Sequence, residues 1–131
     1  MNDTARRVLL CDDEVHILRA ASMKLSRAGL QIETASDGQM AWEMIQNNPP
    51  HLLVTDYQMP RMNGLELCRK IRGWETTRNL PIVLLSAKGY EFDWDELALE
   101  LWLTKVMVKP FSPRELLLTA QQALGLIEQT N

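Results

Sequence analysis

The sequence predicts an α/β fold in which a doubly wound, five-stranded parallel sheet is flanked by five helices. Short apolar runs alternate five times with longer stretches of helical periodicity, which is typical of βαβ units. Most of the apolar runs are nearly continuous in Val, Ile and Leu, as in strands that helices cover on both faces. Right-handed crossover connections then favour the strand order 2-1-3-4-5.

The five apolar runs define the predicted strands and their ends. They are Arg7 to Cys11, Leu30 to Ala35, His51 to Thr55, Leu80 to Leu85, and Lys105 to Val108. In doubly wound sheets, ligands bind beyond the carboxyl ends of the strands, near the point where the strand order reverses. The residues that follow these runs are therefore the first candidates for a functional site.

Three helices are predicted between the first four strands. The first carries a stripe spaced three and four residues apart, with Gly29 where a left-handed C-terminal cap is needed. That stripe consists of Val15, Leu18, Ser22 and Leu25. The second helix runs from about Gly38 to Asn48 and is stopped by Pro49, and the third runs from about Gly64 to Arg72.

Two further helices have clear capping signals at their starts. Asp93 and Glu96 form a capping-box pair ahead of the fourth helix. The fifth helix repeats this pattern, with Ser112 as the cap, Pro113 at the first helical position and Glu115 three residues after the cap.

The length and composition are those of one ordinary globular domain. The chain has 131 residues, of which 46% are hydrophobic and 24% charged, so residues 1–131 are expected to form one module without an output domain. A net charge of -3 gives no basic footprint for direct nucleic-acid binding. No apolar run approaches the ~20 residues of a membrane span, and we expect a cytoplasmic protein without membrane insertion. Cys11 and Cys68 match no metal or redox spacing, which favours buried, reduced thiols.

Four of the five predicted strands end on polar residues that a purely structural sheet does not require. These residues are Asp12 with Asp13, Asp56, Ser86 and Lys109. Neighbouring strands would bring them to one edge of the sheet. Two carboxylates ~4 Å apart repel by about 4 kcal/mol at an effective dielectric constant of about 20, so either one acid is protonated or a cation is bound. Oxygen ligands without a His or Cys cluster indicate Mg²⁺, or Mn²⁺ in its place.

The same side chains can hold a phosphoryl group. A carboxylate can act as a nucleophile and form an aspartyl phosphate. Mg²⁺, Lys109 and Ser86 would then hold the phosphoryl oxygens during in-line transfer. Asp56 is the candidate nucleophile because it stands alone after the central third strand, whereas Asp12 and Asp13 are paired as if to share a metal.

The segment from Asp56 to Glu66, DYQMPRMNGLE, closely resembles the phosphoacceptor loop of the response-regulator receiver domains of two-component systems. The resemblance covers almost the whole chain, since Asp12, Asp13, Ser86 and Lys109 follow the family's order. It implies a flavodoxin-like or CheY-like fold and a Mg²⁺-dependent role in a phosphorelay. Asp56 would accept a phosphoryl group from the phosphohistidine of a sensor histidine kinase or a histidine phosphotransfer protein.

The resemblance implies a role for each site residue. Asp13 and Asp56 would ligate Mg²⁺ directly, together with the backbone carbonyl of Gln58. Asp12 would act partly through water, and Lys109 would pair with the phosphoryl oxygens. The domain would phosphorylate and dephosphorylate itself rather than turn over an external substrate.

Three positions concern the switch of the family. Ser86 fills the Ser/Thr switch position, and the bond from Lys109 to Pro110 would be cis, as in the family. The family usually has Tyr or Phe three residues before the lysine, whereas this chain has Val106. The usual aromatic coupling between phosphorylation and the outer face is therefore in doubt, and a different or weak relay must be allowed.

A second departure lies between the fourth helix and the fifth strand. The family commonly has a Gly-Ala turn there, but this chain has Trp102, so either the helix runs on or the loop is rebuilt. If the helix extends through Leu103, then Leu99, Trp102 and Leu103 form a second apolar side. We expect this side to be a surface for a downstream partner or for self-association, on the face of the fourth helix, fifth strand and fifth helix.

Two other classes of function remain open beside the phosphoacceptor. A hydrolase resembling haloacid dehalogenases would use the same aspartyl phosphate, but it needs a second acid two residues after the nucleophile, where this chain has Gln58. A receiver-like scaffold would bind partners or dimerise with weak or atypical phospho-switching. The presence of Val106 favours the scaffold, and the intact acidic and lysine positions oppose it.

Overall fold

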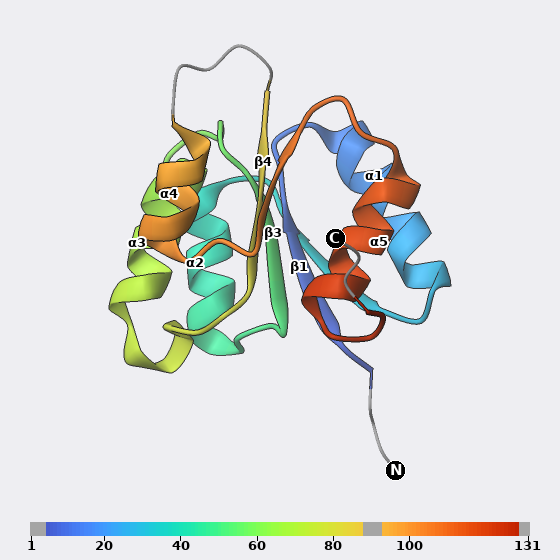
Figure 1. Ribbon diagram of the computed structural model, residues 1–131, viewed down its shortest axis with the longest axis horizontal. Helices are drawn as coiled ribbons and strands as arrows, with labels where there is room; N and C mark the ends of the chain where they lie inside the picture. The colour runs from blue at the N-terminus through green and yellow to red at the C-terminus, as the bar shows by residue number, and fades with distance from the viewer. Residues whose placement is uncertain (1–4, 88–92, 129–131) are drawn as a thin grey trace.

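Five parallel strands form one sheet at the centre of the molecule (Figure 1). The computed structural model describes residues 5–87 and 93–128. The strands are β1 (Arg7–Cys11), β2 (Gln31–Ala35), β3 (Leu52–Asp56), β4 (Ile82–Ser86) and β5 (Lys105–Val108). Their order is β2-β1-β3-β4-β5 with every pair parallel, which confirms the predicted topology.

Helices cover both faces of the sheet (Figure 1). They are α1 (Val15–Arg27), α2 (Gly38–Asn47), α3 (Gly64–Gly73), α4 (Trp94–Leu101) and α5 (Pro113–Ala123), with a short 3-10 helix η1 (Glu75–Thr77) after α3. Figure 1 shows α1 and α5 on one face, and α2, α3 and α4 on the other. Among the described residues, no helix combines the length and the apolar character that crossing a membrane requires.

The sheet separates two hydrophobic cores because successive strand residues point to opposite faces. In β1, Leu9 and Cys11 belong to the core under α2, α3 and α4, whereas Val8 and Leu10 belong to the core under α1 and α5. All five residues of β3 are buried, as expected for the central strand. Both cysteines are free and buried, as predicted.

The predicted helix starts are confirmed by their capping contacts. The Asp93 side chain accepts a hydrogen bond from the amide of Glu96, and Ser112 and Glu115 form a complete capping box at α5. At the end of α1, Gly29 has a positive φ of 94°, as the predicted left-handed cap requires.

The buried face of α1 differs in part from the predicted stripe. Ala21 and Leu25 are the buried residues of the helix, while Leu18 is half-buried. Val15 belongs to the same stripe by spacing but is 57% exposed at the first position of the helix.

The helix α4 does not run on past Leu101, so the rebuilt loop is the correct alternative. Trp102 caps the helix with φ 53° and ψ 44°, the left-handed conformation that usually selects Gly. The amide of Leu103 then donates to the carbonyl of Ala98, and the chain turns toward β5. From α3, the Arg72 guanidinium donates to the carbonyls of Leu101 at 2.6 Å and Trp102 at 3.1 Å, which satisfies the end of α4.

Candidate functional site

The carboxyl ends of four strands bring the predicted site residues together. Asp12 follows β1, Asp56 ends β3, Ser86 ends β4 and Lys109 follows β5. Carboxylate oxygens of Asp12, Asp13 and Asp56 all lie within 4.8 Å of one another. Residues far apart in the chain therefore form one acidic cluster at the edge of the sheet where ligands bind in doubly wound folds.

Burial of this cluster makes its negative charge costly. Asp12 and Asp56 are buried, whereas Asp13 is exposed. Burial, reinforced by the negative charge of Asp12, raises the pKa of Asp56 to about 6 although Lys109 opposes the shift. Burial also raises the pKa of Asp12 above its usual value. Two buried carboxylates beside an exposed one are hard oxygen donors of the kind that divalent cations prefer, and a cation there would relieve the repulsion.

Lys109 lies at the centre of the negative groups. Its Nζ atom is 2.9 Å from Oε1 of Glu14, 3.1 Å from Oδ2 of Asp12 and 3.3 Å from Oδ1 of Asp56. Burial alone would lower the pKa of Lys109, but hydrogen bonds to Glu14 and Asp12 outweigh it and raise the pKa. The lysine is thus held as a cation beside the candidate nucleophile.

Sequence reasoning missed Glu14 as a member of this site. It is the third consecutive acid after β1, and this run was the available signal. Its backbone amide donates to Oδ1 of Asp12 at 3.0 Å, and its side chain reaches Lys109. The hydrogen bond to Lys109 lowers the pKa of Glu14, so that it adds a charge to the site.

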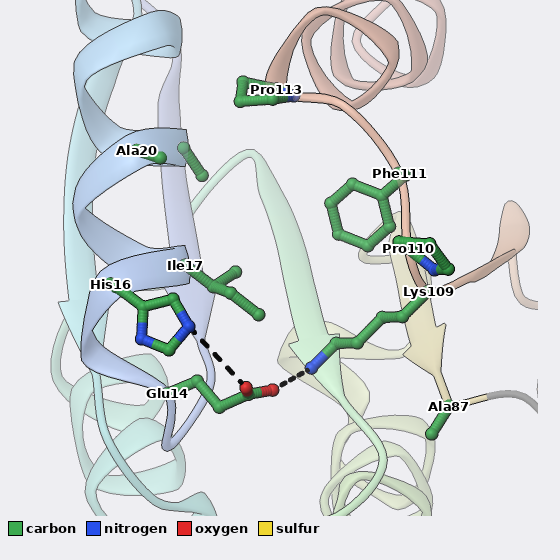
Figure 2. Close-up of a pocket in the computed structure, with 10 residues that line it drawn as sticks. Glu14, His16, Ile17, Ala20, Ala87, Lys109, Pro110, Phe111 and Pro113 are labelled. Carbon is green, nitrogen blue, oxygen red and sulfur yellow. Dashed lines mark hydrogen bonds and ion pairs between the residues drawn. The ribbon is translucent and has the colours of Figure 1, made fainter.

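Two open cavities adjoin at Lys109. One, of about 480 Å³, has Asp13, Asp56, Gln58 and Lys109 in its lining. The other, of about 500 Å³, is mainly apolar and lies between the start of α1 and the connection from β5 to α5 (Figure 2). The acidic cluster is therefore open to solvent through the first cavity.

The loop that follows Asp56 is held by close backbone packing. The amide of Gly64 donates to the carbonyl of Tyr57 at 2.7 Å. A Cβ atom on Gly64 would lie 2.3 Å from the carbonyl oxygen of Asp56, so only Gly fits there. The Asn63 and Glu66 capping box then begins α3. This close approach fixes the position of the start of α3 relative to Asp56.

The α2 side of the same loop carries an ion pair. Asp37 is buried, caps α2 through a bond from the amide of Met40 and pairs with the guanidinium of Arg61. Arg61 itself has a positive φ of 68°. The hydrogen bond from Met40, followed by that from Arg61, lowers the pKa of Asp37. The ion pair therefore links the acceptor loop to the start of α2.

The two candidate switch residues lie on the neighbouring strands β4 and β5, two register positions apart, and are not equally enclosed. Ser86 is fully buried, and its hydroxyl donates to the carbonyl of Ala87 at 3.1 Å. Val106 is half-buried in β5, opposite Leu84 of β4, and packs against the core under α2, α3 and α4. The bond between Lys109 and Pro110 is cis, as the resemblance implied.

Two of the three residues of the candidate interaction surface are exposed. Leu99 is 79% exposed and Trp102 is 61% exposed. The prediction was wrong for Leu103, which is only 9% exposed. Because Trp102 adopts the left-handed conformation, the next side chain turns into the core instead of continuing a helical stripe.

A parallel sheet of this order, with carboxylates and a lysine at its carboxyl edge, is the architecture of a phosphoacceptor module. Residues 8–121 match the family model for the response regulator receiver domain, and the chain belongs to this family. The fold of CheY4, a chemotaxis response regulator of Vibrio cholerae, superposes with a TM-score of 0.83 at 31% identity, over 92% of this chain and 99% of that protein.

Curated relatives are longer than this chain. PhoP of Bacillus subtilis, a transcriptional regulatory protein of alkaline phosphatase synthesis, is 39% identical over 110 residues, which are 84% of this chain and 45% of that protein. SrrA of Staphylococcus aureus, also a transcriptional regulatory protein, is 35% identical over 96% of this chain and 51% of its own length. The chain thus spans about half the length of these relatives, and the shared part is the receiver domain.

Proposed function

We propose that the chain receives a phosphoryl group on Asp56 in a two-component phosphorelay. The observation that carries this proposal is the placement of the Asp56 carboxylate, which ends the central strand 3.3 Å from the Lys109 ammonium and lines an open cavity. Receiver domains are signalling domains, and their family interacts with histidine kinases and downstream targets. The donor is a phosphohistidine of such a kinase or of a histidine phosphotransfer protein.

The acidic cluster fits the divalent cation that receiver domains bind. Asp12, Asp13 and Asp56 would hold Mg²⁺ together with the backbone carbonyl of Gln58, since Mg²⁺ prefers oxygen ligands and combines carboxylates with substrate phosphates. When bound, Mg²⁺ supplies positive charge for the phosphoryl oxygens and the carboxylates. The protein supplies the nucleophile and its orientation.

The remaining roles belong to side chains of this chain. Asp56 forms the bond to phosphorus while the donor's bond to phosphorus breaks. Lys109 holds a fixed positive charge beside the oxygens on which negative charge accumulates. Ser86 is proposed to reorient its hydroxyl toward the phosphoryl group, with Val106 on the neighbouring strand in place of the usual aromatic residue. Because Gln58 stands where a hydrolase of this chemistry needs a second acid, we propose no turnover of an external substrate.

The signal is proposed to leave through the face of α4, β5 and α5. Leu99 and Trp102 are exposed apolar side chains on or beside α4. They would contact a downstream protein or a second copy of the domain. Sedimentation of phosphorylated and unphosphorylated protein, with Trp102→Ala as the variant, tests this surface. A monomer at every concentration, with no partner lost in the variant, contradicts it.

The mass of the intact protein tests phosphoacceptance directly. Incubation with acetyl phosphate and Mg²⁺ is expected to add ~80 Da to the wild type and nothing to Asp56→Asn. No adduct on the wild type overturns the proposal and favours a receiver-like scaffold that binds partners without phosphorylation. Sustained release of phosphate from a small ester favours the hydrolase.

A further inference from the structure

Glu14 connects the start of α1 to Lys109 in the acidic site. It is the N-terminal cap residue of α1, and its Oε1 atom makes the shortest of the three contacts to Lys109, at 2.9 Å. Figure 2 shows this bridge spanning the gap between α1 and the chain that carries Pro110. Its other oxygen, Oε2, faces Nε2 of His16 at 3.9 Å.

Three carboxylates surround the Lys109 ammonium: Asp12 and Glu14 accept hydrogen bonds from it, and Asp56 is an ion-pair partner. An ammonium group has three N–H donors and no acceptor. Glu14, Asp12 and Asp56 each lie within reach of Nζ, at 2.9 to 3.3 Å. A phosphoryl group on Asp56 brings three further acceptor oxygens. The phosphoryl oxygens take over the contact with Asp56 and compete with Asp12 and Glu14 for the ammonium, so a lysine that turns more than one donor to them releases one of these two carboxylates.

Burial decides which carboxylate is released. The Asp12 side chain is only 2% exposed, so without its lysine it would be a buried and uncompensated charge. The Glu14 side chain is 45% exposed, and water can take the place of the lysine. Glu14 is therefore the partner that Lys109 gives up at the lowest cost.

The same bridge separates the two cavities. Glu14, Ala87 and Lys109 line both the cavity at Asp56 and the apolar cavity beside Phe111. Movement of the lysine from Glu14 toward Asp56 would remove the bridge between them. The structural change that follows phosphorylation, loss of the bridge between Glu14 and Lys109, would then reach the start of α1 without involving Val106.

We propose that Glu14 is a positioning residue that holds Lys109 in the unphosphorylated protein and is exchanged for phosphoryl oxygens when Asp56 is modified. This inference rests on the proposed phosphoacceptor function. In the reaction used as a test, an oxygen of Asp56 forms a bond to phosphorus, the bond from phosphorus to the acyl oxygen of acetyl phosphate breaks, and acetate leaves with the electron pair.

The first test compares the kinetics of three variants with those of the wild type. Glu14→Gln removes the charge, and Glu14→Asp keeps a charge but shortens the side chain by one methylene. Glu100→Gln is the matched control, because Glu100 makes an exposed ion pair with Arg69 at 3.6 Å. The rate of adduct formation is measured against acetyl phosphate concentration at saturating Mg²⁺, and thermal unfolding shows that each variant is folded.

The expected change lies in the limiting rate. Glu14→Gln and Glu14→Asp should each raise it about two- to fivefold, the scale of one partly exposed ion pair, with the half-saturating donor concentration unchanged. Glu100→Gln should match the wild type. A Glu14 that acted only through its charge would give a different result. Glu14→Asp would then behave as the wild type, and Glu14→Gln would alter the half-saturating donor concentration. That result would overturn the proposal.

The second test needs no comparison of rates. The side-chain carboxyl carbon of Glu14 is observed by NMR in wild-type protein before and after phosphorylation, with Glu100 as the reference. We expect the Glu14 signal to move toward that of a solvated carboxylate, while Glu100 stays in place. An adduct on Asp56 with an unmoved Glu14 signal refutes the exchange alone, whereas no adduct refutes both the exchange and the proposed function.

Discussion

The rings of Tyr57 and Trp94 meet edge to face, with centroids 5.9 Å apart and an interplanar angle of 76°. Tyr57 directly follows Asp56, and Trp94 is the first residue of α4. The contact therefore joins the acceptor loop to α4 without involving Val106. It provides a physical link between the chemistry and the helix that carries Leu99.

A double-mutant cycle should detect this link as a coupling free energy. Tyr57→Ala and Trp94→Ala are expected to couple by about 0.5–1.5 kcal/mol, the range for an edge-to-face aromatic pair. The measurement is urea unfolding of the wild type, both single variants and the double variant. The pair of Trp42 and Trp74, with centroids 5.8 Å apart, is a reference for the same geometry elsewhere in the fold. Additive single effects would contradict the coupling.

Substitution of Gly64 should be far more damaging than substitution of Gly73. A Cβ atom at Gly64 would approach the backbone oxygen of Asp56 to 2.3 Å, whereas a Cβ atom at Gly73 meets nothing within 4 Å. We expect Gly64→Ala to lower the free energy of unfolding by about 2–4 kcal/mol. Gly73→Ala, at the end of α3, should raise it by about 0.5–1 kcal/mol. Chemical denaturation measures both, and equal effects would show that the loop can move aside.

The Asp37 carboxylate should stabilise the protein at neutral pH and cease to do so in acid. Hydrogen bonds from Met40 and Arg61 lower its pKa in the folded state, so its contribution is complete above the unfolded pKa of about 3.9 and disappears as the pH falls through the folded value. The difference in unfolding free energy between wild type and Asp37→Asn should therefore be constant from pH 7 to 5 and decrease below pH 4. A difference that does not change over this range contradicts the prediction.

Removing one carboxylate from the acidic cluster should stabilise the metal-free protein. Burial and the charge of Asp12 disfavour ionised Asp56, so Asp56→Asn is expected to raise the free energy of unfolding by about 1–3 kcal/mol at pH 7.5 in the presence of a chelator. Added Mg²⁺ should stabilise the wild type more than the variant. Thermal unfolding with and without Mg²⁺ measures both effects. A less stable variant under chelation would show that Lys109 outweighs the repulsion.

Glycine should be preferred to alanine in place of Trp102. Both substitutions remove the indole, but the left-handed conformation at φ 53° is costly for a residue with a Cβ atom. Trp102→Gly is therefore expected to be more stable than Trp102→Ala by about 1 kcal/mol. Paired urea unfolding curves give the difference. Equal stability would mean that the turn relaxes once the indole is absent.

Local patterns in the sequence predicted the strands, the helix starts and most of the site. The polar residues at strand ends are visible in the sequence because the apolar runs beside them are clear, so Asp12, Asp56 and Lys109 could be brought together by topology alone. Glu14 could not be assigned in this way. Its role depends on how far the Lys109 side chain reaches across the gap, and the alternation of strands and helices does not give that distance.

The surface beside α4 was only partly predictable for a different reason. Helical spacing places Leu99, Trp102 and Leu103 on one side only if every residue stays helical. A single left-handed residue, Trp102, breaks that spacing and sends Leu103 into the core. Backbone propensity favours Gly in the left-handed conformation, so the sequence did not predict that Trp102 would adopt it. The hydrogen bonds from Arg72 that satisfy the carbonyls of Leu101 and Trp102 come from α3, 29 and 30 residues away in the chain.

Asp56 is the last residue of the central strand β3, and all five residues of that strand are buried. Such a residue has almost no freedom to shift when its side chain gains volume and charge. A modification there must be absorbed by whatever is softer around it, namely the long lysine side chain and the connections beyond the sheet. The sheet stays in place, and the lysine side chain and the connections at its carboxyl edge are the parts that move.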